Sequence, residues 1–174
     1  AHQADNAALA VAMLRHARVL ALPSQAFVRA MTDVRWPARL QKLHPGPLTG
    51  TREVWLDGGH NAQAAELLAE TIASLTHGHA LHLVTGMLST KDMEGLLTPF
   101  RGVAAQVHAI PFDHPLAVPA TDLAAAARRL GLQAEARESL EQALAHAPEG
   151  SPVLIAGSLY LAGEVLALNG ELPD

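Results

Sequence analysis

From residue 53 onwards, short apolar runs alternate along the chain with segments whose apolar residues recur at helical spacing. Such runs are typical of buried strands, and recurrence about every three to four residues is typical of amphipathic helices. Repeated strand–helix units require a mostly parallel sheet with helices on both faces. The pattern predicts strands at residues 53–56, 80–85, 103–110, 133–136 and 152–156, and helices at residues 62–75, 92–98, 120–130, 139–146 and 159–168.

The part of the chain before residue 53 follows a different pattern. Residues 5–20 have the spacing of one amphipathic helix, with Asp5 or Asn6 as its N-cap. A shorter helical piece runs from Pro23 to about Met31.

Residues 39–43 alternate between polar and apolar positions, between Trp36-Pro37 and the proline-rich stretch 44–47. Alternation between turn signals predicts a strand at the edge of the sheet, antiparallel to its neighbour. We therefore expect an α/β protein with a Rossmann-like, mostly parallel sheet of about six strands, one antiparallel edge strand and helices on both faces. The natural boundary within the chain falls between Leu20 and Trp36.

Composition excludes several classes of protein. The chain has 174 residues, 49% of them apolar and 3% aromatic, which is typical of a globular, helix-rich protein. The net charge is −5 and the basic residues are scattered, so we expect no nucleic-acid partner. No cysteine is available for disulfides or thiolate chemistry, and no apolar run reaches the length of a membrane span. We therefore expect a cytoplasmic protein, and a first residue of Ala rather than Met suggests a fragment or a processed chain.

Polar residues gather where the first strand of the βα series stops. The apolar residues 54–56 are followed by Asp57-Gly-Gly-His60-Asn61. In open α/β sheets, ligands bind outside the carboxyl ends of the strands, beside the exposed N–H groups of helix N-termini. We expect Asp57 to accept hydrogen bonds from ribose hydroxyls and His60 to orient a carboxylate or phosphate. A tight turn closed by Asn61 as an N-cap explains the same residues without a ligand.

Three further strand ends carry polar side chains, and a doubly wound sheet places them along one rim. Lys91 follows a flexible turn and suits an anion as a point charge. Ser158 opens the last helix and can offer its hydroxyl and backbone N–H to a carboxylate, with an N-cap alone as the alternative. Asp113 and His114 follow the third strand of the series and can equally be ordinary loop residues.

Two other patterns do not predict a site. Ala156-Gly-Ser-Leu-Tyr160 lacks the second glycine of the G-x-S-x-G nucleophile elbow, which excludes a serine hydrolase of that class. His77, His79 and His82 straddle a turn and a strand start, where alternation sends them to different faces, so we predict no metal site there.

Four short motifs follow one another along the chain. They are Trp36-Pro-Ala-Arg39-Leu-Gln41, Leu56-Asp57-Gly-Gly-His60-Asn61, Gly86-Met-Leu-Ser-Thr-Lys91-Asp92 and Gly157-Ser158-Leu-Tyr160. They resemble W-P-G-R-L-Q, L-D-x-A-H-N, G-x-x-x-D-K-D and G-S-L-Y of the folylpolyglutamate synthase/dihydrofolate synthase enzymes of the Mur ligase superfamily, with Ala38 in place of the first glycine. In addition, His2-Gln3-Ala-Asp-Asn6-Ala-Ala resembles the H-Q-x-x-N-A-A that closes the central ATPase domain of these enzymes.

The resemblance implies a domain organisation for nearly the whole chain. Residues 1–20 would be the last helix of the preceding central ATPase domain, residues 21–35 a linker, and residues 36–174 a Mur-ligase-type C-terminal domain. The partner of this domain would be the N-terminal ATPase domain of the same protein.

The resemblance also implies an ATP-dependent ligase. A carboxylate of folate or dihydropteroate would be phosphorylated to an acyl phosphate, which the amine of L-glutamate then attacks. Carried over residue by residue, Asn6 would meet the adenine of ATP, and Arg39 and Asp57 its ribose and phosphates.

The resemblance assigns the contacts with glutamate to a second group of residues. His60 and Lys91 would act as catalytic residues near the incoming glutamate and the transferred phosphoryl group, and with Asn61 and Ser158 they would bind substrate. Such a reaction needs no protein nucleophile, only positioning and neutralisation of charge.

The P-loop G-x-x-x-x-G-K-[ST] does not occur in this sequence. In the family it lies, with the ligands of Mg²⁺, in the preceding domain. We therefore expect ATP and Mg²⁺ to be used by the full-length protein, and we expect this chain alone neither to hydrolyse ATP nor to ligate glutamate. Two alternatives stay open: the C-terminal domain of a peptidoglycan-type Mur ligase, and a non-catalytic nucleotide-binding or interaction module.

Overall fold

The computed structural model describes residues 2–17, 19–34 and 36–172 and divides the chain into two compact units, Ala1–Trp36 and Pro37–Asp174. We call them the N-terminal unit and the sheet unit. Residues 1, 18, 35 and 173–174, which fall in the predicted first helix, linker and C-terminal domain, lie outside the described residues.

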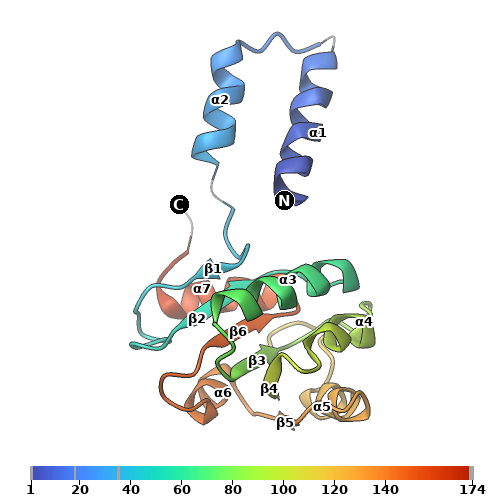
Figure 1. Cartoon of the computed structure of the whole chain (residues 1–174), viewed down its shortest axis with the longest axis vertical. Helices are drawn as coiled ribbons and strands as arrows, with labels where there is room; N and C mark the ends of the chain where they lie inside the picture. Colours follow the sequence, from blue (N-terminus) through green and yellow to red (C-terminus); the bar gives the residue numbers. More distant parts are fainter. Residues whose placement is uncertain (1, 18, 35, 173–174) are drawn as a thin grey trace. The chain divides into compact units, whose positions relative to one another are not determined.

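The N-terminal unit consists of two helices, α1 (His2–His16) and α2 (Ser24–Asp33) (Figure 1). The predicted start of α1 was wrong, because the helix begins before Asp5 and places this carboxylate in its first turn, where it complements the positive end of the helix. The predicted end near Leu20 was also wrong. The His16 ring nitrogen Nδ1 lies 2.8 Å from the Ala12 carbonyl oxygen, one turn earlier in the same helix. None of the described side chains of this unit is buried.

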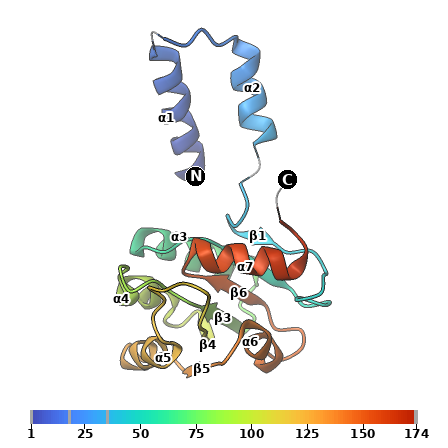
Figure 2. The same cartoon turned by 180° about the vertical axis from the view of Figure 1, so that it is seen from behind.

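Within the described residues, six strands form one sheet in the order β1-β2-β6-β3-β4-β5 (Figure 2). Strand β1 runs antiparallel to β2, and every other neighbouring pair is parallel. The predicted fold class, including the antiparallel edge strand, is confirmed. The strands are β1 (Gln41–Lys42), β2 (Val54–Asp57), β3 (Leu81–Thr85), β4 (Ala104–Ala109), β5 (Ala134–Ala136) and β6 (Val153–Ala156).

Five helices of the sheet unit start within one residue of their predicted positions. They are α3 (Ala62–Leu75), α4 (Met93–Leu97), which a 3-10 turn (Thr98–Phe100) extends, α5 (Ala120–Arg129), α6 (Leu140–His146) and α7 (Leu159–Asn169). Helices α3, α4 and α5 pack on one face of the sheet, and α6 and α7 pack on the other (Figures 1 and 2). No helix among the described residues combines the length and the hydropathy needed to cross a lipid bilayer.

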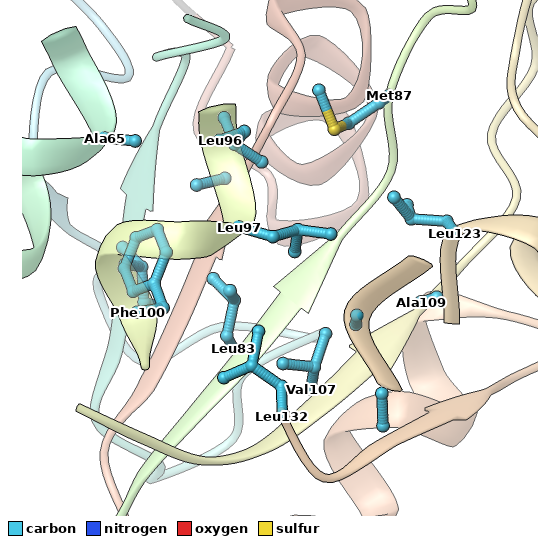
Figure 3. Packing of buried hydrophobic residues seen from close by; sticks show 14 of the residues in the cluster. Ala65, Leu83, Met87, Leu96, Leu97, Phe100, Val107, Ala109, Leu123 and Leu132 are labelled. Atoms are coloured by element: carbon cyan, nitrogen blue, oxygen red, sulfur yellow. The ribbon is translucent and has the colours of Figure 1, made fainter. Parts of the chain in front are cut away.

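Two apolar clusters hold these layers together. Every residue of β3 and β6 is buried, as expected for central parallel strands covered on both faces. On the first face, Leu83 of β3 and Val107 of β4 lie together, with Leu97 and Phe100 close by (Figure 3). On the second face, β-strand side chains such as Ile155 pack against α6 and α7.

The topology fixes where a ligand can bind. Strand β6 lies between β2 and β3, but the helix after β6 covers one face while the helices after β2 and β3 cover the other. At such a switch in direction, the loops at the carboxyl ends of the strands diverge and leave a crevice.

Candidate functional site

A cleft of about 240 Å³ lies at the carboxyl ends of β2, β3 and β6. The three loops that follow these strands each contribute to its walls. Its lining residues are His60 from the first loop, Leu88, Thr90 and Lys91 from the second, and Gly157, Ser158, Leu159 and Tyr160 from the third.

The three loops start at the same height because of the register of the strands. Asp57 at the end of β2 and Thr85 at the end of β3 both pair with Ala156 of β6. The residues that follow these three positions therefore leave the sheet side by side. The structure thus brings together His60, Lys91 and Ser158, three of the predicted site residues, whose roles stay predictions.

Gly157 permits the close approach of these loops. Its φ of +120° is rarely adopted by residues with a Cβ, and its N–H donates to the Gly59 carbonyl oxygen at 3.1 Å. A Cβ at this position would lie 2.7 Å from Thr85 Oγ1 and 2.8 Å from the Gly86 carbonyl oxygen. Only glycine fits where the loops meet.

His60 is half-buried and its tautomer is set by the turn that carries it. Its Nδ1 lies 3.0 Å from the Gly58 carbonyl oxygen. Since a carbonyl can only accept, Nδ1 carries the proton and donates, and Nε2 of the neutral ring is left with a free lone pair. The imidazole can therefore accept a proton or a hydrogen bond at Nε2.

Lys91 supplies positive charge to the cleft. Among the residues that the structure describes, no carboxylate lies within ion-pair distance of its ammonium group. The neighbouring Asp92 is engaged elsewhere, because its Oδ1 accepts from the Gly95 N–H at 3.0 Å and caps α4. The ammonium group is thus available to an anion.

Ser158 lines the cleft at the start of α7. Its side chain is 4% exposed and its Oγ accepts from the Tyr160 N–H at 3.1 Å, which makes it the N-cap of the helix. Ser158 is therefore an N-cap, and a role in binding a carboxylate in addition stays a prediction. The N-terminus of an 11-residue helix also opens into the cleft, where its dipole favours a negative group.

Asp57 and Arg39 lie outside the lining of this cleft. The Asp57 carboxylate already accepts two backbone hydrogen bonds, from the Gly59 N–H to Oδ1 at 2.6 Å and from the Leu40 N–H to Oδ2 at 2.7 Å. Arg39 is exposed and stands between Ala38 and Leu40, which have φ values of +56° and +45°. The carboxylate therefore fixes the turn that presents the Arg39 guanidinium.

The two predicted asparagines are found in different places. Asn61 caps α3 through its Oδ1, which accepts from the Ala64 N–H at 2.9 Å, and its exposed side chain does not line the cleft. Asn6 is exposed on α1 in the N-terminal unit. Roles of Asn61 in substrate binding and of Asn6 in nucleotide binding stay predictions.

Sequence reasoning did not single out Thr90 or Tyr160 as site residues. Both line the cleft, and both stand inside motifs already picked out, next to Lys91 and two residues after Ser158. Their positions inside these two motifs were the only sequence signal that could have pointed to them. Across the described ranges, no three His, Asp or Glu side chains are grouped closely enough to hold a metal ion.

Comparison with known families matches residues 46–168 to the family described as "Dihydrofolate synthetase, C-terminal domain". Two curated relatives extend the match. A dihydrofolate synthase/folylpolyglutamate synthase of Bacillus subtilis is 26% identical over 169 residues, which cover 94% of this chain and 38% of that protein. A folylpolyglutamate synthase of Lacticaseibacillus casei is 28% identical over 145 residues, which cover 83% of this chain and 32% of that protein.

Solved structures give the same result. FolC of E. coli in complex with DHPP and ADP superposes with a TM-score of 0.75 at 27% identity, over 94% of this chain and 38% of that chain. Folylpolyglutamate synthase of Mycobacterium tuberculosis with ADP and AMPPCP has a TM-score of 0.70 at 27% identity, over 88% of this chain and 36% of that chain. The present chain thus spans less than two fifths of each of these relatives.

Proposed function

The chain belongs to the dihydrofolate synthetase C-terminal domain family, and from this membership we propose that it is the C-terminal domain of an ATP-dependent ligase that joins L-glutamate to folate or dihydropteroate. The observation that carries the proposal is the convergence of His60, Lys91 and Ser158 on one cleft at the carboxyl ends of β2, β3 and β6. The cleft offers a cation, an unprotonated imidazole nitrogen and a helix N-terminus. These are the groups needed to bring a carboxylate and an amine to a phosphorylated acyl group.

The reaction has two steps. A carboxylate oxygen of the folate substrate attacks the terminal phosphorus of ATP, and ADP leaves, which gives an acyl phosphate. The glutamate amine then attacks the acyl carbon, the bond from that carbon to the phosphate oxygen breaks, and inorganic phosphate leaves with the electron pair. The attacking nitrogen loses one proton and an amide remains.

Two residues act on the reacting atoms. The Lys91 ammonium neutralises negative charge on the transferred phosphoryl group, which lowers the barrier of both steps. His60 accepts the proton of the attacking amine at Nε2, because its Nδ1–H is already committed to the Gly58 carbonyl oxygen.

The glutamate substrate is held by its carboxylates. The N-terminus of α7 at Ser158 binds one of them through the exposed N–H groups and the dipole of the helix. Asn61, at the N-terminus of α3, gives a second contact from the neighbouring loop.

We assign the contacts with the nucleotide to Arg39 and Asp57. Arg39 is an exposed guanidinium, which fits a phosphate, and the remaining lone pairs of Asp57 can accept from ribose hydroxyls. Asn6 contacts the adenine. The complexes of E. coli FolC with ADP and of M. tuberculosis folylpolyglutamate synthase with AMPPCP support ATP as the nucleotide. We propose Mg²⁺ as its counterion, with metal ligands in the rest of the protein.

The same proposal covers the organisation of the full-length protein. Residues 1–20 belong to the end of the central ATPase domain, residues 21–35 are a linker, and residues 36–174 are the C-terminal domain that closes the active site against the ATPase domain. A cytoplasmic location is part of the proposal.

The decisive experiment uses the full-length protein with ATP, L-glutamate and a folate or dihydropteroate acceptor. Lys91→Ala is expected to lower kcat by about 100-fold or more, the effect of removing one preorganised group that stabilises developing charge. Lys42→Ala is the matched control, because Lys42 pairs with Glu53 at 3.1 Å on the edge strand, outside the cleft lining. Equal activity of the two variants would contradict the assignment, and absence of ligation by the wild type would contradict the function.

The isolated chain gives a second prediction. The purified 174 residues are expected to show no ATP hydrolysis and no glutamate ligation, since the P-loop sequence is missing from them. A phosphate-release assay and product analysis by mass spectrometry measure both activities. Sustained turnover by this chain would show that the catalytic machinery had been placed in the wrong part of the protein.

A further inference from the structure

The loop after β4 contributes nothing to the lining of the cleft, yet it contacts two elements that do, the loop after β3 and helix α7. We call residues 111–118 the buttress loop. Its Leu116 carbonyl oxygen accepts from the Ser89 N–H at 2.8 Å, and its Val118 N–H donates to the Met87 carbonyl oxygen at 2.8 Å. An antiparallel bridge between Leu88 and Ala117 joins the same two segments. The buttress loop therefore fixes the backbone that carries Thr90 and Lys91.

The buttress loop also contacts the first turns of α7. The Asp113 N–H donates to Glu164 Oε1 at 2.7 Å. The His114 ring packs against the Tyr160 ring with centroids 4.4 Å apart and an interplanar angle of 51°. Tyr160 lines the cleft and is 57% exposed, so few neighbours restrain its ring. Among the described residues, His114 is the aromatic side chain that packs against it.

The orientation of His114 is set by its own loop. Its Nδ1 accepts from the Leu116 N–H at 3.0 Å, its N–H donates to the Phe112 carbonyl oxygen at 2.9 Å, and its carbonyl oxygen accepts from the Ala117 N–H at 2.9 Å. Phe112 is buried and lies so close to Gly86 that a Cβ there would come within 2.8 Å of Phe112 Cδ1. One of these bonds holds the ring and the other two hold its backbone, so the His114 ring stands on a fixed, packed loop as a rigid support.

We propose that His114 is a positioning residue for the amino-acid side of the cleft. It holds the Tyr160 ring in one orientation, and this ring forms a wall beside Ser158 and Lys91. The proposal rests on the proposed ligase function, because the molecule that the wall orients is the incoming glutamate. Without the His114 ring, the Tyr160 ring is free to rotate about its side-chain bonds, and the binding of glutamate must then order it.

Loss of the His114 ring is expected to affect the binding of glutamate and not that of ATP. Arg39 and Asp57, assigned to the nucleotide, lie outside the cleft lining, and among the described residues neither side chain is hydrogen-bonded to the buttress loop. Loss of the His114 ring therefore raises the KM for glutamate and leaves the KM for ATP unchanged.

Two substitutions separate the contribution of the His114 ring from that of its Nδ1 acceptor. His114→Phe keeps a ring to pack against Tyr160 and removes the acceptor of the Leu116 N–H. His114→Asn keeps an acceptor on a short side chain and removes the ring. His79→Asn is the matched control, because His79 is exposed before β3, at the end of the strand opposite the cleft.

In the full-length enzyme, His114→Asn is expected to raise the KM for glutamate by about three- to tenfold, the range of an aromatic pair, and to change the KM for ATP by less than about twofold. His114→Phe is expected to restore the KM for glutamate to within about twofold of the wild type. An unchanged KM in His114→Asn, an equal increase in His114→Phe, or an equal increase in the KM for ATP would each overturn the proposal.

A measurement on the present chain tests the contact without any enzymatic activity. Tyr160 is the single tyrosine of these 174 residues, so its ring protons can be assigned directly by NMR. Their shifts are expected to move toward solvent values in His114→Asn and to stay displaced in His114→Phe. Unchanged shifts in His114→Asn overturn the inference, whereas failure of the wild-type enzyme to ligate glutamate overturns the proposed function and the inference together.

Discussion

The carboxylate of Asp57 holds two separate backbone segments in place. One oxygen accepts from Gly59 in the turn after β2, and the other accepts from Leu40 in the turn before β1. The Gly58 N–H returns a bond of 2.8 Å to the Ala38 carbonyl oxygen. A left-handed φ of +56° at Ala38, where the similar family motif has glycine, shows that this turn requires a conformation that costs an L-residue about 1–2 kcal/mol.

Asp57→Asn is expected to lower the free energy of unfolding by about 1–3 kcal/mol. The amide presents one oxygen and one NH₂ group, so one of the two backbone N–H groups loses a charged acceptor and faces a donor. Asp92→Asn is the matched control, since Asp92 accepts a single cap bond from Gly95 that an amide oxygen can also accept. Urea unfolding of both variants measures the difference, and equal effects would contradict the double role of Asp57.

A pair of buried histidines links β3 to β4 away from the cleft lining. Their rings stack with centroids 5.3 Å apart, and His82 Nδ1 lies 3.0 Å from His108 Nε2. Arg137 Nε–H donates to His108 Nδ1 at 3.2 Å, so the proton of His108 sits on Nε2 and is donated to His82. Burial lowers the pKa of His82, and it lowers the pKa of His108 to about 4, helped by the nearby His82, Arg137 and His146 and opposed by Glu135.

The lowered pKa of His108 makes stability depend on pH. Between pH 6.5 and about 4 the unfolded chain binds a proton that the folded chain does not, so acid favours unfolding in this window. The contribution is fully present above pH 6.5, and about 3 kcal/mol of it is lost by pH 4. We expect the free energy of unfolding, measured by urea titration, to fall between pH 7 and pH 4 by about 3 kcal/mol less in His108→Gln than in the wild type. The control His79→Gln changes an exposed histidine and should follow the wild type. Parallel curves for wild type and His108→Gln would contradict the lowered pKa.

At the scale of elements, side-chain caps explain why four of the five helices of the sheet unit start where the sequence predicts, whereas α5 follows Pro119 without such a cap. Asn61, Asp92, Ser139 and Ser158 each accept a backbone N–H of the first turn of the helix that follows. A cap acts within a few residues, so it can be recognised from local sequence. Helix α1 differs, because Asp5 resembles a cap in the sequence but lies inside the helix.

The end of α7 is held by contacts that local sequence does not reveal. Asn169 is 4% exposed, and its Oδ1 accepts from the Leu48 and Thr49 N–H groups at 3.3 and 3.2 Å. Its Nδ2 donates to the His44 carbonyl oxygen at 3.0 Å and to Glu171. The last turn of α7 is thereby fastened to the loop between β1 and β2.

Asn169→Ala is expected to lower the free energy of unfolding by about 3 kcal/mol, because it leaves the buried Thr49 N–H and the partly buried Leu48 N–H and His44 carbonyl without their partner. Asn61→Ala is the same chemical change at an exposed cap and should cost about 1 kcal/mol. Chemical denaturation of the two variants gives the comparison. A smaller loss at Asn169 than at Asn61 would show that the network around α7 does not stabilise the fold.

At the scale of the whole molecule, stability resides in the sheet unit. Every member of the two buried clusters lies in this unit, from Ala38 to Leu166, while α2 buries no side chain. Helices of 15 and 10 residues, the lengths of α1 and α2, are marginal in water without tertiary packing.

Removal of residues 1–36 is therefore expected to leave the cooperative thermal transition of residues 37–174 within about 2 °C of that of the whole chain, a difference of less than about 0.5 kcal/mol. Removal of residues 159–174 is the control, because it deletes the α7 side chains of the second cluster, including Leu161 and Val165, and should abolish cooperative unfolding. Calorimetry measures both. A midpoint lowered by about 10 °C or more on removal of residues 1–36 would show that the N-terminal unit supports the core.

The sequence by itself determined the type and order of the elements, the helix starts in the sheet unit and the antiparallel edge strand. These follow from local physics, since buried parallel strands are continuous apolar runs and caps act on the next turn. It also supplied the motifs that pointed to the family. Tertiary structure alone decided that β6 inserts between β2 and β3, which brings His60, Lys91 and Ser158 to one cleft.

Tertiary structure also decided the partners of individual side chains. The contacts of Asp57 with Leu40, of His82 with His108 and of His114 with Tyr160 each join segments that are distant in sequence. Such pairs depend on strand register and on which faces pack together, and a register shift of one residue would send every side chain of a strand to the other face. A local pattern fixes which face of an element is apolar, but only the packed sheet fixes which polar side chains meet at its edge.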